Sequence, residues 1–178
     1  LPVQSGSDRI LAGMRRGYTV AGYRQAVARL RAAVPHCALT TDVIVGFPGE
    51  TDDDFEATRA LYREVRFDNS FIFKYSPRPG TPAADDADDV PDPVKDARNR
   101  VLLADQDRIG LACNEAWIGR ETEVLAEGPS PRNAARWCGR NGQNKIVLFE
   151  PRGALAPGAC VRVRIDRAKP QTLYGSIV

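Results

Sequence analysis

Two short apolar runs separated by a helical pattern constrain the fold of this chain more than any other feature. Residues 38–45 and 70–75 are rich in β-branched and aromatic side chains, which favour strands. Between them, Thr51 is a typical helix N-cap, and the three aspartates at 52–54 suit the positive end of a helix. This order predicts parallel strands joined by a crossover helix, and hence an α/β fold. We expect the strand at 38–45 to be buried on both faces.

Apolar spacing predicts four helices. Ser7 is suited to cap a short first helix that Gly17 ends, and Pro35 stops the second helix. The residues expected to face the core are Val20, Tyr23, Val27, Leu30 and Val34 in the second helix, Phe55, Thr58, Leu61, Tyr62 and Val65 in the third, and Val94, Val101, Ile109 and Ala112 in a last helix over residues 94–117.

The pattern of apolar residues changes to period two after Gly119. The apolar side chains of Val161, Val163 and Ile165 alternate with polar ones, and about five short strands fit between residue 119 and the C-terminus. Five short strands in about sixty residues are typical of a small all-β barrel of the oligonucleotide-binding (OB-like) kind. We therefore expect two domains, residues 1–117 and residues 118–178.

The charge is divided unevenly between these two parts. Residues 1–117 carry 15 Lys and Arg against 18 Asp and Glu, whereas residues 118–178 carry 10 against 5. A small basic appendage behind an acidic body indicates a polyanion partner, with an ordinary basic surface as the alternative. No apolar run approaches the length of a membrane span, and we expect a cytoplasmic protein with no membrane partner.

The four cysteines predict no metal site. Cys37, Cys113, Cys138 and Cys160 are widely spaced, without a CxxC or CxxxCxxC motif, and such cysteines are usually buried thiols. The single histidine, His36, follows a proline in a predicted loop and has no partner motif. We therefore expect no metal ligands in this chain.

Three polar segments rich in glycine, proline and serine follow predicted strands, which are the short apolar start at residues 1–4 and the strands at 38–45 and 70–75. They are QSGS at 4–7, GFPGE at 46–50 and YSPRPGT at 75–81. Parallel α/β sheets bind ligands at the carboxyl ends of their strands, so we expect these segments to share one site. The glycines would admit a ligand against bare backbone, although a tight turn that simply needs glycine explains GFPGE equally well.

Individual side chains in these segments have two interpretations. Gln4, Ser5 and Ser7 could hydrogen-bond a polar ligand or serve as a helix cap. Arg78 could grip an anionic substrate or be a surface charge. Taken alone, Phe73 and Tyr75 favour the core over a stacking role.

The predicted barrel interleaves cations with an aromatic ring. The residues concerned are Arg132, Arg136, Trp137, Arg140 and Lys145, and Arg162 and Arg164 could extend the patch. Such a surface suits stacking and phosphate contact on unpaired RNA.

The motifs together resemble those of a known family. The segments LPVQSGSDRILAGMRRGYT, TTDVIVGFPGETDDDFEAT and VRFDNSFIFKYSPRPGTPAA look like the C-terminal half of the radical S-adenosylmethionine domain of methylthiotransferases, a partial TIM-like barrel. The basic tail resembles their TRAM domain, a small RNA-binding β-barrel. Where the family tends to have Gly-Arg-Thr, this chain has Asn141 after Gly139 and Arg140.

The resemblance implies the cofactors and the site residues. It implies S-adenosylmethionine and two [4Fe-4S] clusters, with an external electron donor. The cofactor would contact Gln4, Ser5, Ser7, Ile44, Val45, Gly46, Glu50, Phe73 and Tyr75, with Glu50 organising the turn. RNA or substrate would contact Arg78, Arg136, Trp137, Arg140, Asn144 and Lys145.

The resemblance also implies a substrate. RGYT and FKYSPRPGTPAA are most similar to the members that add a methylthio group to C2 of N6-isopentenyladenosine in the tRNA anticodon stem-loop. Sibling members act on N6-threonylcarbamoyladenosine or on a ribosomal-protein aspartate, and a non-catalytic RNA-binding protein is the alternative of another class. The cluster cysteines of the family are absent, so we expect an inactive, monomeric C-terminal fragment with no identifiable catalytic residue.

Overall fold

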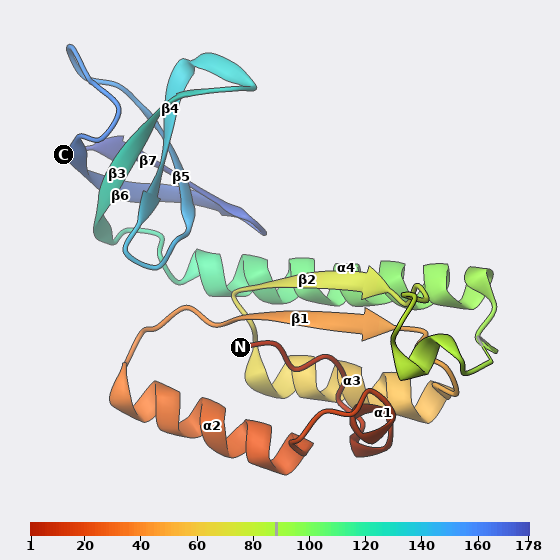
Figure 1. Cartoon of the computed structure of the whole chain (residues 1–178). Helices are drawn as coiled ribbons and strands as arrows, with labels where there is room; N and C mark the ends of the chain where they lie inside the picture. Colours follow the sequence, from red (N-terminus) through yellow and green to blue (C-terminus); the bar gives the residue numbers. More distant parts are fainter. Residues whose placement is uncertain (88) are drawn as a thin grey trace. The chain divides into compact units, whose positions relative to one another are not determined.

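The computed structural model describes residues 1–87 and 89–178 (Figure 1). By internal contacts the chain divides into residues 1–106 and residues 107–178, and helix α4 begins in the first unit and ends in the second. The elements are α1 (Asp8–Gly13), α2 (Val20–Ala33), β1 (Thr40–Val45), α3 (Asp52–Val65), β2 (Asn69–Lys74), the 3-10 helix η1 (Pro82–Ala84), α4 (Asp92–Glu115), β3 (Glu121–Ser130), β4 (Asn133–Asn141), β5 (Ile146–Glu150), β6 (Cys160–Lys169) and β7 (Thr172–Ile177).

The first unit is built on the predicted parallel pair. Strands β1 and β2 pair in parallel from Thr40 opposite Asn69 to Val45 opposite Lys74, with α3 as the crossover helix. The N-terminal segment runs along the free edge of β1, where the backbone of Gln4 exchanges two hydrogen bonds with β1. Parallel pairing and mixed α/β content are thus confirmed.

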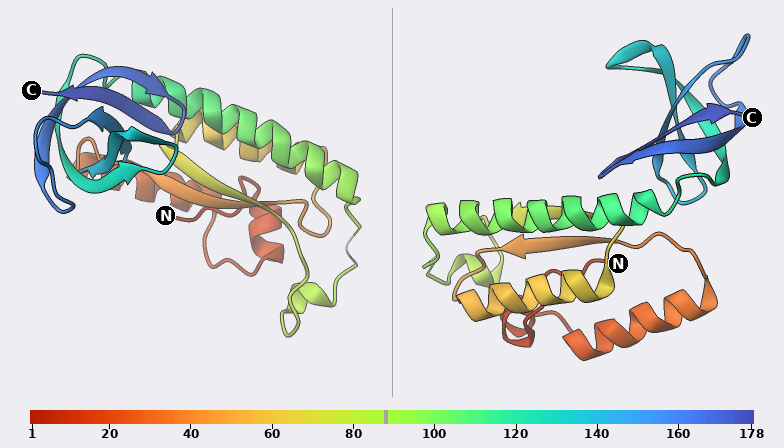
Figure 2. Two further views of the ribbon diagram at one scale, coloured as in Figure 1. Left: turned by 90° about the horizontal axis from the view of Figure 1, so that it is seen from above. Right: turned by 180° about the vertical axis from the view of Figure 1, so that it is seen from behind.

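Only one face of this sheet is buried, so the expectation of burial on both faces was wrong. Thr41, Val43 and Val45 point to a buried face, and Figure 2 shows α3 and α4 side by side along it. On the other face Phe71 and Phe73 remain 57% and 54% exposed. No helix among the described residues of this unit packs over that face, which is why burial alternates along β1 instead of being continuous.

Helix α4 buries polar residues where an apolar stripe was expected. Of the four residues expected inward, Ile109 is buried, whereas Val101 and Ala112 are exposed and Val94 is only partly buried. The buried side chains of the helix include Lys95, Arg98, Leu102, Asp105 and Gln106, at helical spacing. Polar residues can be buried there because they have partners, such as the Asp105 carboxylate 2.7 Å from Arg59 on α3.

The other two helical stripes differ in extent. All five residues expected inward in α3 are buried. In α2, Val20, Tyr23 and Val27 are buried as predicted, but Leu30 is only partly buried and Val34 is exposed. The second helix therefore covers the core with its first three turns only.

The second unit is a closed five-stranded barrel. The strands pair in the cyclic order β3-β4-β5-β7-β6, and β6 pairs with β3 to complete the circle. The core is formed by Val124, Ala126, Val147, Phe149, Val163, Ile165 and Leu173. Gly139 and Gly175 face this core, because a Cβ at either position would collide with a core valine, Val124 or Val163, as well as with the backbone of the neighbouring strand. The five strands expected from the sequence are confirmed.

Gly6 allows the N-terminal segment to lie directly against α3. A Cβ on Gly6 would be 2.5 Å from the Cα of Thr58 and 2.6 Å from the carbonyl oxygen of Ala57. Both are backbone atoms, which a side-chain rotation cannot move away. The same backbone approach lets the Gly6 N–H donate to the Thr58 hydroxyl at 2.9 Å.

We predict that Gly6→Ala lowers the free energy of unfolding by about 2 kcal/mol or more, because overpacking forces the segment away from α3. Gly17→Ala is the matched control, since nothing lies within 4 Å of a Cβ at Gly17. Urea unfolding followed by circular dichroism measures both variants. Equal midpoints for the two would contradict the close approach.

Candidate functional site

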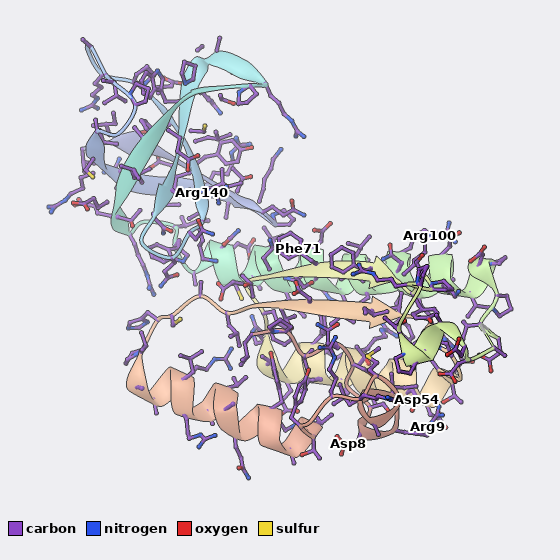
Figure 3. All side chains as sticks on the ribbon, viewed as in Figure 1. Asp8, Arg9, Asp54, Phe71, Arg100 and Arg140 are labelled. Carbon is purple, nitrogen blue, oxygen red and sulfur yellow. The ribbon has the colours of Figure 1, made fainter. Side chains whose placement is uncertain are left out.

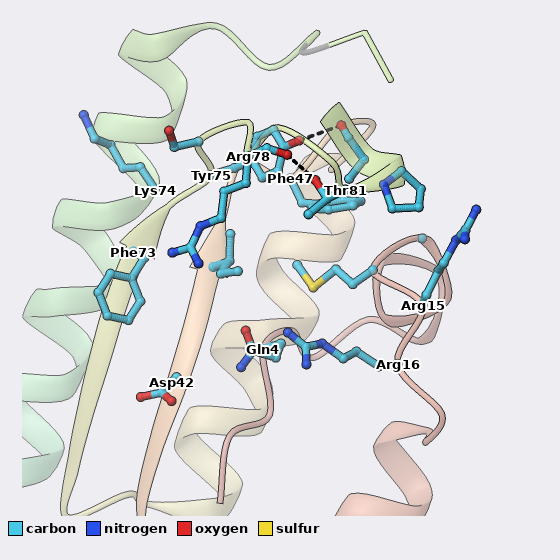
Figure 4. A pocket seen from close by; sticks show the side chains of 16 residues that line it. Gln4, Arg15, Arg16, Asp42, Phe47, Phe73, Lys74, Tyr75, Arg78 and Thr81 are labelled. Atoms are coloured by element: carbon cyan, nitrogen blue, oxygen red, sulfur yellow. Dashed lines mark hydrogen bonds between the residues drawn. The ribbon is translucent and has the colours of Figure 1, made fainter. Parts of the chain in front are cut away.

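A pocket of about 690 Å³ opens at the carboxyl ends of β1 and β2 (Figure 4). This volume is ordinary for a small-molecule site. Its lining residues are Gln4, Gly13, Met14, Arg15, Arg16, Asp42, Ile44, Phe47, Phe73, Lys74, Tyr75, Ser76, Arg78, Thr81, Pro82 and Ala83. The three segments that follow the strands thus contribute to one cavity, together with the end of α1.

Five of the residues expected at the site line this pocket. Gln4 comes from the N-terminal segment, Ile44 from β1, Phe73 from β2, and Tyr75 and Arg78 from the loop after β2. Because the sheet face is open here, Phe73 is exposed and Tyr75 only partly buried, so the core role that we favoured for them was wrong. The ring of Tyr75 packs edge-to-face with Phe47 at 5.2 Å between centroids.

Ser5 and Ser7 do not line the pocket. Ser5 is fully buried, and its hydroxyl is 3.4 Å from that of Thr58. Ser7 caps α1 by accepting a hydrogen bond from the Ile10 N–H, and its hydroxyl donates to Asp54 at 2.6 Å. The structure therefore places both serines in the support of the segment and confirms the helix-cap interpretation of Ser7.

Val45, Gly46 and Glu50 form the turn behind the pocket. Val45 is fully buried, and Gly46 has a φ of 72°, which favours glycine. The Gly46 N–H donates to the Glu50 carboxylate at 2.7 Å, so Glu50 organises this turn. A Cβ on Gly46 would collide with the aliphatic stem of Lys95, so a side chain of α4 approaches this backbone closely.

Glu50 forms a buried ion pair with Arg98 of α4. The Arg98 guanidinium donates to the carboxylate of Glu50 at 2.8 Å and to its main-chain carbonyl at 3.1 Å. The second guanidinium nitrogen donates to Asp52 at 2.8 Å. Burial raises the pKa of Glu50, while the Gly46 N–H and Arg98 act in the opposite direction. The pair ties the turn after β1 to α4.

We predict that Glu50→Gln lowers the free energy of unfolding by about 3 kcal/mol, because the buried charge of Arg98 is then left without its carboxylate partner. Asp52→Asn is the control and should cost about 1 kcal/mol or less. Both acids contact the same guanidinium, but the side chain of Glu50 is 1% exposed and that of Asp52 is 94% exposed. Urea unfolding at pH 7 compares the two, and similar losses would contradict the role of burial.

Asp54 connects the cap of α3 to the N-terminal segment. Thr51 and Asp54 form a capping box, and Arg9 makes an ion pair with Asp54 (Figure 3). Burial raises the pKa of Asp54, but hydrogen bonds from Ser7, Arg9 and Thr51 outweigh this effect and hold the pKa well below its usual range. The predicted cap at Thr51 is confirmed.

We predict that Asp54→Asn costs about 2 kcal/mol of unfolding free energy at pH 7. Because the pKa of Asp54 is lower in the folded state than in the unfolded state, its ionised carboxylate stabilises the protein at pH values above the unfolded pKa of about 4. This contribution is lost as the pH falls toward the folded-state pKa. The difference between wild type and variant should therefore shrink between pH 4 and pH 2. Denaturant unfolding across this range measures it, and a difference independent of pH would contradict the assignment.

Two arginines point into the pocket from opposite sides. Figure 4 shows the Arg16 guanidinium beside the Gln4 amide, and the Arg78 guanidinium reaching in from the loop after β2. No ion pair of either arginine is found in the part of the chain that the structure describes. With the carboxylate of Asp42 and the rings of Phe47 and Tyr75, the pocket suits an aromatic ligand that carries an anionic group.

Sequence reasoning missed Arg16 and Asp42. Arg16 lies just beyond α1, after Arg15, which has a φ of 54°. The RRG sequence at the end of a short helix was the only signal for this bend. Asp42 could have been found, because residues two apart in a strand share a face and Ile44 was already a candidate.

The barrel residues expected to contact RNA do not form one surface. Lys145 is buried, and its ammonium donates to Asn114 at 2.9 Å. Trp137 is partly buried and packs against the barrel core. Arg140 forms an ion pair with Glu127 and also donates to Asn144, whose φ is 57°.

The alternation of side chains along β4 explains this difference, since neighbouring residues of a strand point to opposite faces. Arg136 and Arg140 point outward, on the other side of the strand from Trp137. Lys145 lies outside β4 and is buried through its contact with Asn114, so it is withdrawn from direct RNA contact. Contacts by Arg136, Arg140 and Asn144 stay a prediction.

Neither a metal site nor a membrane-spanning helix is found among the described residues. No group of three His, Cys, Asp or Glu side chains among them could hold a metal ion. None of the helices in residues 1–87 and 89–178 is long and apolar enough to cross a membrane.

Comparisons with known proteins match both parts of the chain. Residues 1–62 match the Radical SAM superfamily, and residues 115–178 match the TRAM domain. Three similar relatives each carry the name tRNA-2-methylthio-N(6)-dimethylallyladenosine synthase. They come from Akkermansia muciniphila (49% identical over 98% of this chain), Methylacidiphilum infernorum (46% over 99%) and Nocardia farcinica (49% over 97%).

The chain spans less than two fifths of the length of these curated relatives. It covers 38% of the first two and 36% of the third, and the matched region is their C-terminal part.

Proposed function

We propose that this chain belongs to the radical S-adenosylmethionine methylthiotransferases and corresponds to their C-terminal part. The enzyme of which it forms part would add a methylthio group to C2 of N6-isopentenyladenosine beside the tRNA anticodon. In this proposal residues 1–106 supply part of a cofactor and substrate site, as part of a larger, partial TIM-like barrel. The OB-like barrel of residues 107–178 binds the anticodon stem-loop. Names of relatives at 45–49% identity support the choice of substrate.

The observation that carries the proposal is the shared pocket. Gln4, Ile44 and Tyr75 are far apart in the sequence but line one cavity at the carboxyl ends of parallel strands. Ligands of α/β folds bind at this edge, because backbone groups and loops converge there. The pocket brings together the N-terminal segment and the carboxyl ends of β1 and β2, and this convergence supports one shared ligand site.

The residues present fit S-adenosylmethionine. The rings of Phe47, Phe73 and Tyr75 offer apolar surface to an adenine, and Asp42 offers a carboxylate to hydroxyl or ammonium groups. Arg16 and Arg78 offer guanidinium groups to a carboxylate. The turn held by Glu50 lies directly behind this surface.

The residues of the chain's described part do not fit an iron–sulfur cluster, since no suitable ligand group is found among them. When bound in such an enzyme, S-adenosylmethionine supplies a deoxyadenosyl radical upon reductive cleavage, with electrons from an external donor. The role proposed for this chain is to bind and orient the ligand and to exclude water from one side of the pocket.

Nucleoside mass spectrometry of tRNA tests the proposal. We expect a strain lacking the gene to lose 2-methylthio-N6-isopentenyladenosine and to accumulate N6-isopentenyladenosine. Loss of the methylthio group from threonylcarbamoyladenosine would assign the chain to the sibling tRNA enzymes. An unchanged tRNA profile would contradict any role in tRNA methylthiolation, and loss of the modified ribosomal-protein aspartate would then identify the third sibling.

The same strain tests the pocket when it is complemented with variants of the full-length gene. Arg78→Gln should lower the methylthiolated fraction at limiting expression, because a charge-assisted contact contributes about 1.5–3 kcal/mol. Arg29→Gln is the control, since Arg29 is an exposed arginine of α2 outside the pocket. Equal complementation by both variants, at equal protein levels, would show that Arg78 does not act in the site.

A further inference from the structure

Three cations surround a single aromatic ring on the barrel. The guanidinium of Arg167 lies 4.0 Å from the centroid of the Tyr174 ring, and that of Arg136 lies 5.7 Å from it. The ammonium of Lys169 is 5.9 Å from the same centroid. These residues come from β4, β6 and β7, so the group exists only in the folded barrel. We call Arg136, Arg167, Lys169 and Tyr174 the Tyr174 cluster.

The strand register places this cluster on the outer surface. Leu173 and Gly175 face the core, and therefore Tyr174 between them points outward. On β6, Val163 and Ile165 face the core, and unbroken alternation would send Arg167 inward as well. A register shift between Ile165 and Arg167 interrupts the alternation, so that Arg167 pairs with Tyr174 and points outward.

The positive charge of the cluster is only partly balanced. Among the described residues, Glu150 is the acid nearest to Arg136, at 3.7 Å, and its side chain is 76% exposed. Asp166 directly precedes Arg167 in β6 but is engaged by Arg164 and by the Ser176 hydroxyl. No ion pair of Arg167 or Lys169 is found in residues 1–87 or 89–178. Three cations close to one ring repel each other, and an anion would relieve this repulsion.

We propose that the Tyr174 cluster is the surface of the barrel that contacts RNA, and that it takes unpaired nucleotides. This inference rests on the proposed function and specifies the binding surface within it. Arg136 and Lys169 would contact phosphates, which is the sequence-independent part of RNA binding. The stacked pair of Arg167 and Tyr174 would receive a base, since bases stack on guanidinium planes and on aromatic rings.

This surface differs from the one expected from the sequence. Of the five barrel residues given there as direct contacts, the cluster keeps only Arg136. Lys145 and Trp137 are withdrawn into the barrel, and the charge of Arg140 is paired with Glu127. The cluster offers planar stacking groups as well as cations, and this combination favours unpaired RNA over an acidic peptide.

The proposal is tested by measuring how a fluorescein-labelled RNA hairpin binds to the whole 178-residue chain. The hairpin has a seven-nucleotide loop. Fluorescence anisotropy is measured at several salt concentrations. Arg167→Gln with Lys169→Gln should weaken binding roughly tenfold or more and lower the slope of log affinity against log salt by about 0.7, because Lys169 is the phosphate contact that is lost. Tyr174→Leu should weaken binding by about tenfold with little change in the slope, whereas Tyr174→Phe should bind like wild type.

The matched control is Arg162→Gln with Arg164→Gln. It removes the same charge from the exposed face of the same strand, before the register shift. Thermal unfolding of each variant shows whether the barrel is intact. If Tyr174→Leu is destabilised, Tyr174→His replaces it. Tyr174→His keeps a planar ring and should retain more RNA binding than the Arg167→Gln, Lys169→Gln double variant.

Each outcome separates this inference from the proposed function. Equal losses in the control and cluster variants would overturn the Tyr174 cluster as the RNA surface and leave the proposed function standing. No binding of RNA by wild type would overturn the inference together with the RNA-binding role of the barrel. Displacement of the RNA by polyglutamate at equal charge concentration would identify an acidic protein as the partner and overturn the inference as well.

Discussion

The buried contact between Glu50 and Arg98 is the interaction on which the first unit depends. It fixes the turn after β1 from two sides, because Glu50 accepts from the Gly46 N–H while Arg98 holds the carboxylate and the main chain of Glu50. One turn earlier in α4, the stem of Lys95 packs against Gly46, and its ammonium is 5.6 Å from the centroid of the Tyr75 ring. A single helix thus holds the loops after both strands, and the pocket residues are placed through this support.

Local chemistry made much of the first unit predictable. Thr51 and the aspartates after it define the start of α3, and the five positions of that helix expected to face the core are buried as their spacing indicated. The parallel pairing of β1 and β2 followed from their order with a helix between them. These features depend on neighbours in the sequence or on the general rules of chain connection, so one sequence was enough.

Features that depend on distant partners could not be predicted in this way. An arginine in an amphipathic pattern is normally assigned to the solvent side, yet Arg98 is buried because Glu50, 48 residues away, accepts its hydrogen bonds. Lys145 was assigned to the surface by its charge, although Asn114 binds it inside the second unit. The open face of the sheet, with Phe71 and Phe73 exposed, likewise follows from the absence of a covering helix among the described residues of this unit and not from the strand sequences.

The irregularity in β6 has a consequence for how this barrel can vary in length. Removing Asp166 would close the irregularity and leave Arg167 directly after Ile165, so regular alternation would still point Arg167 outward and Ala168 toward the core. A regular strand with the present number of residues would instead turn Arg167 into the apolar core that contains Ile165 and Leu173. Homologous barrels should therefore lose this irregularity only together with one residue of β6, so that the strand length and the bulge change as a pair.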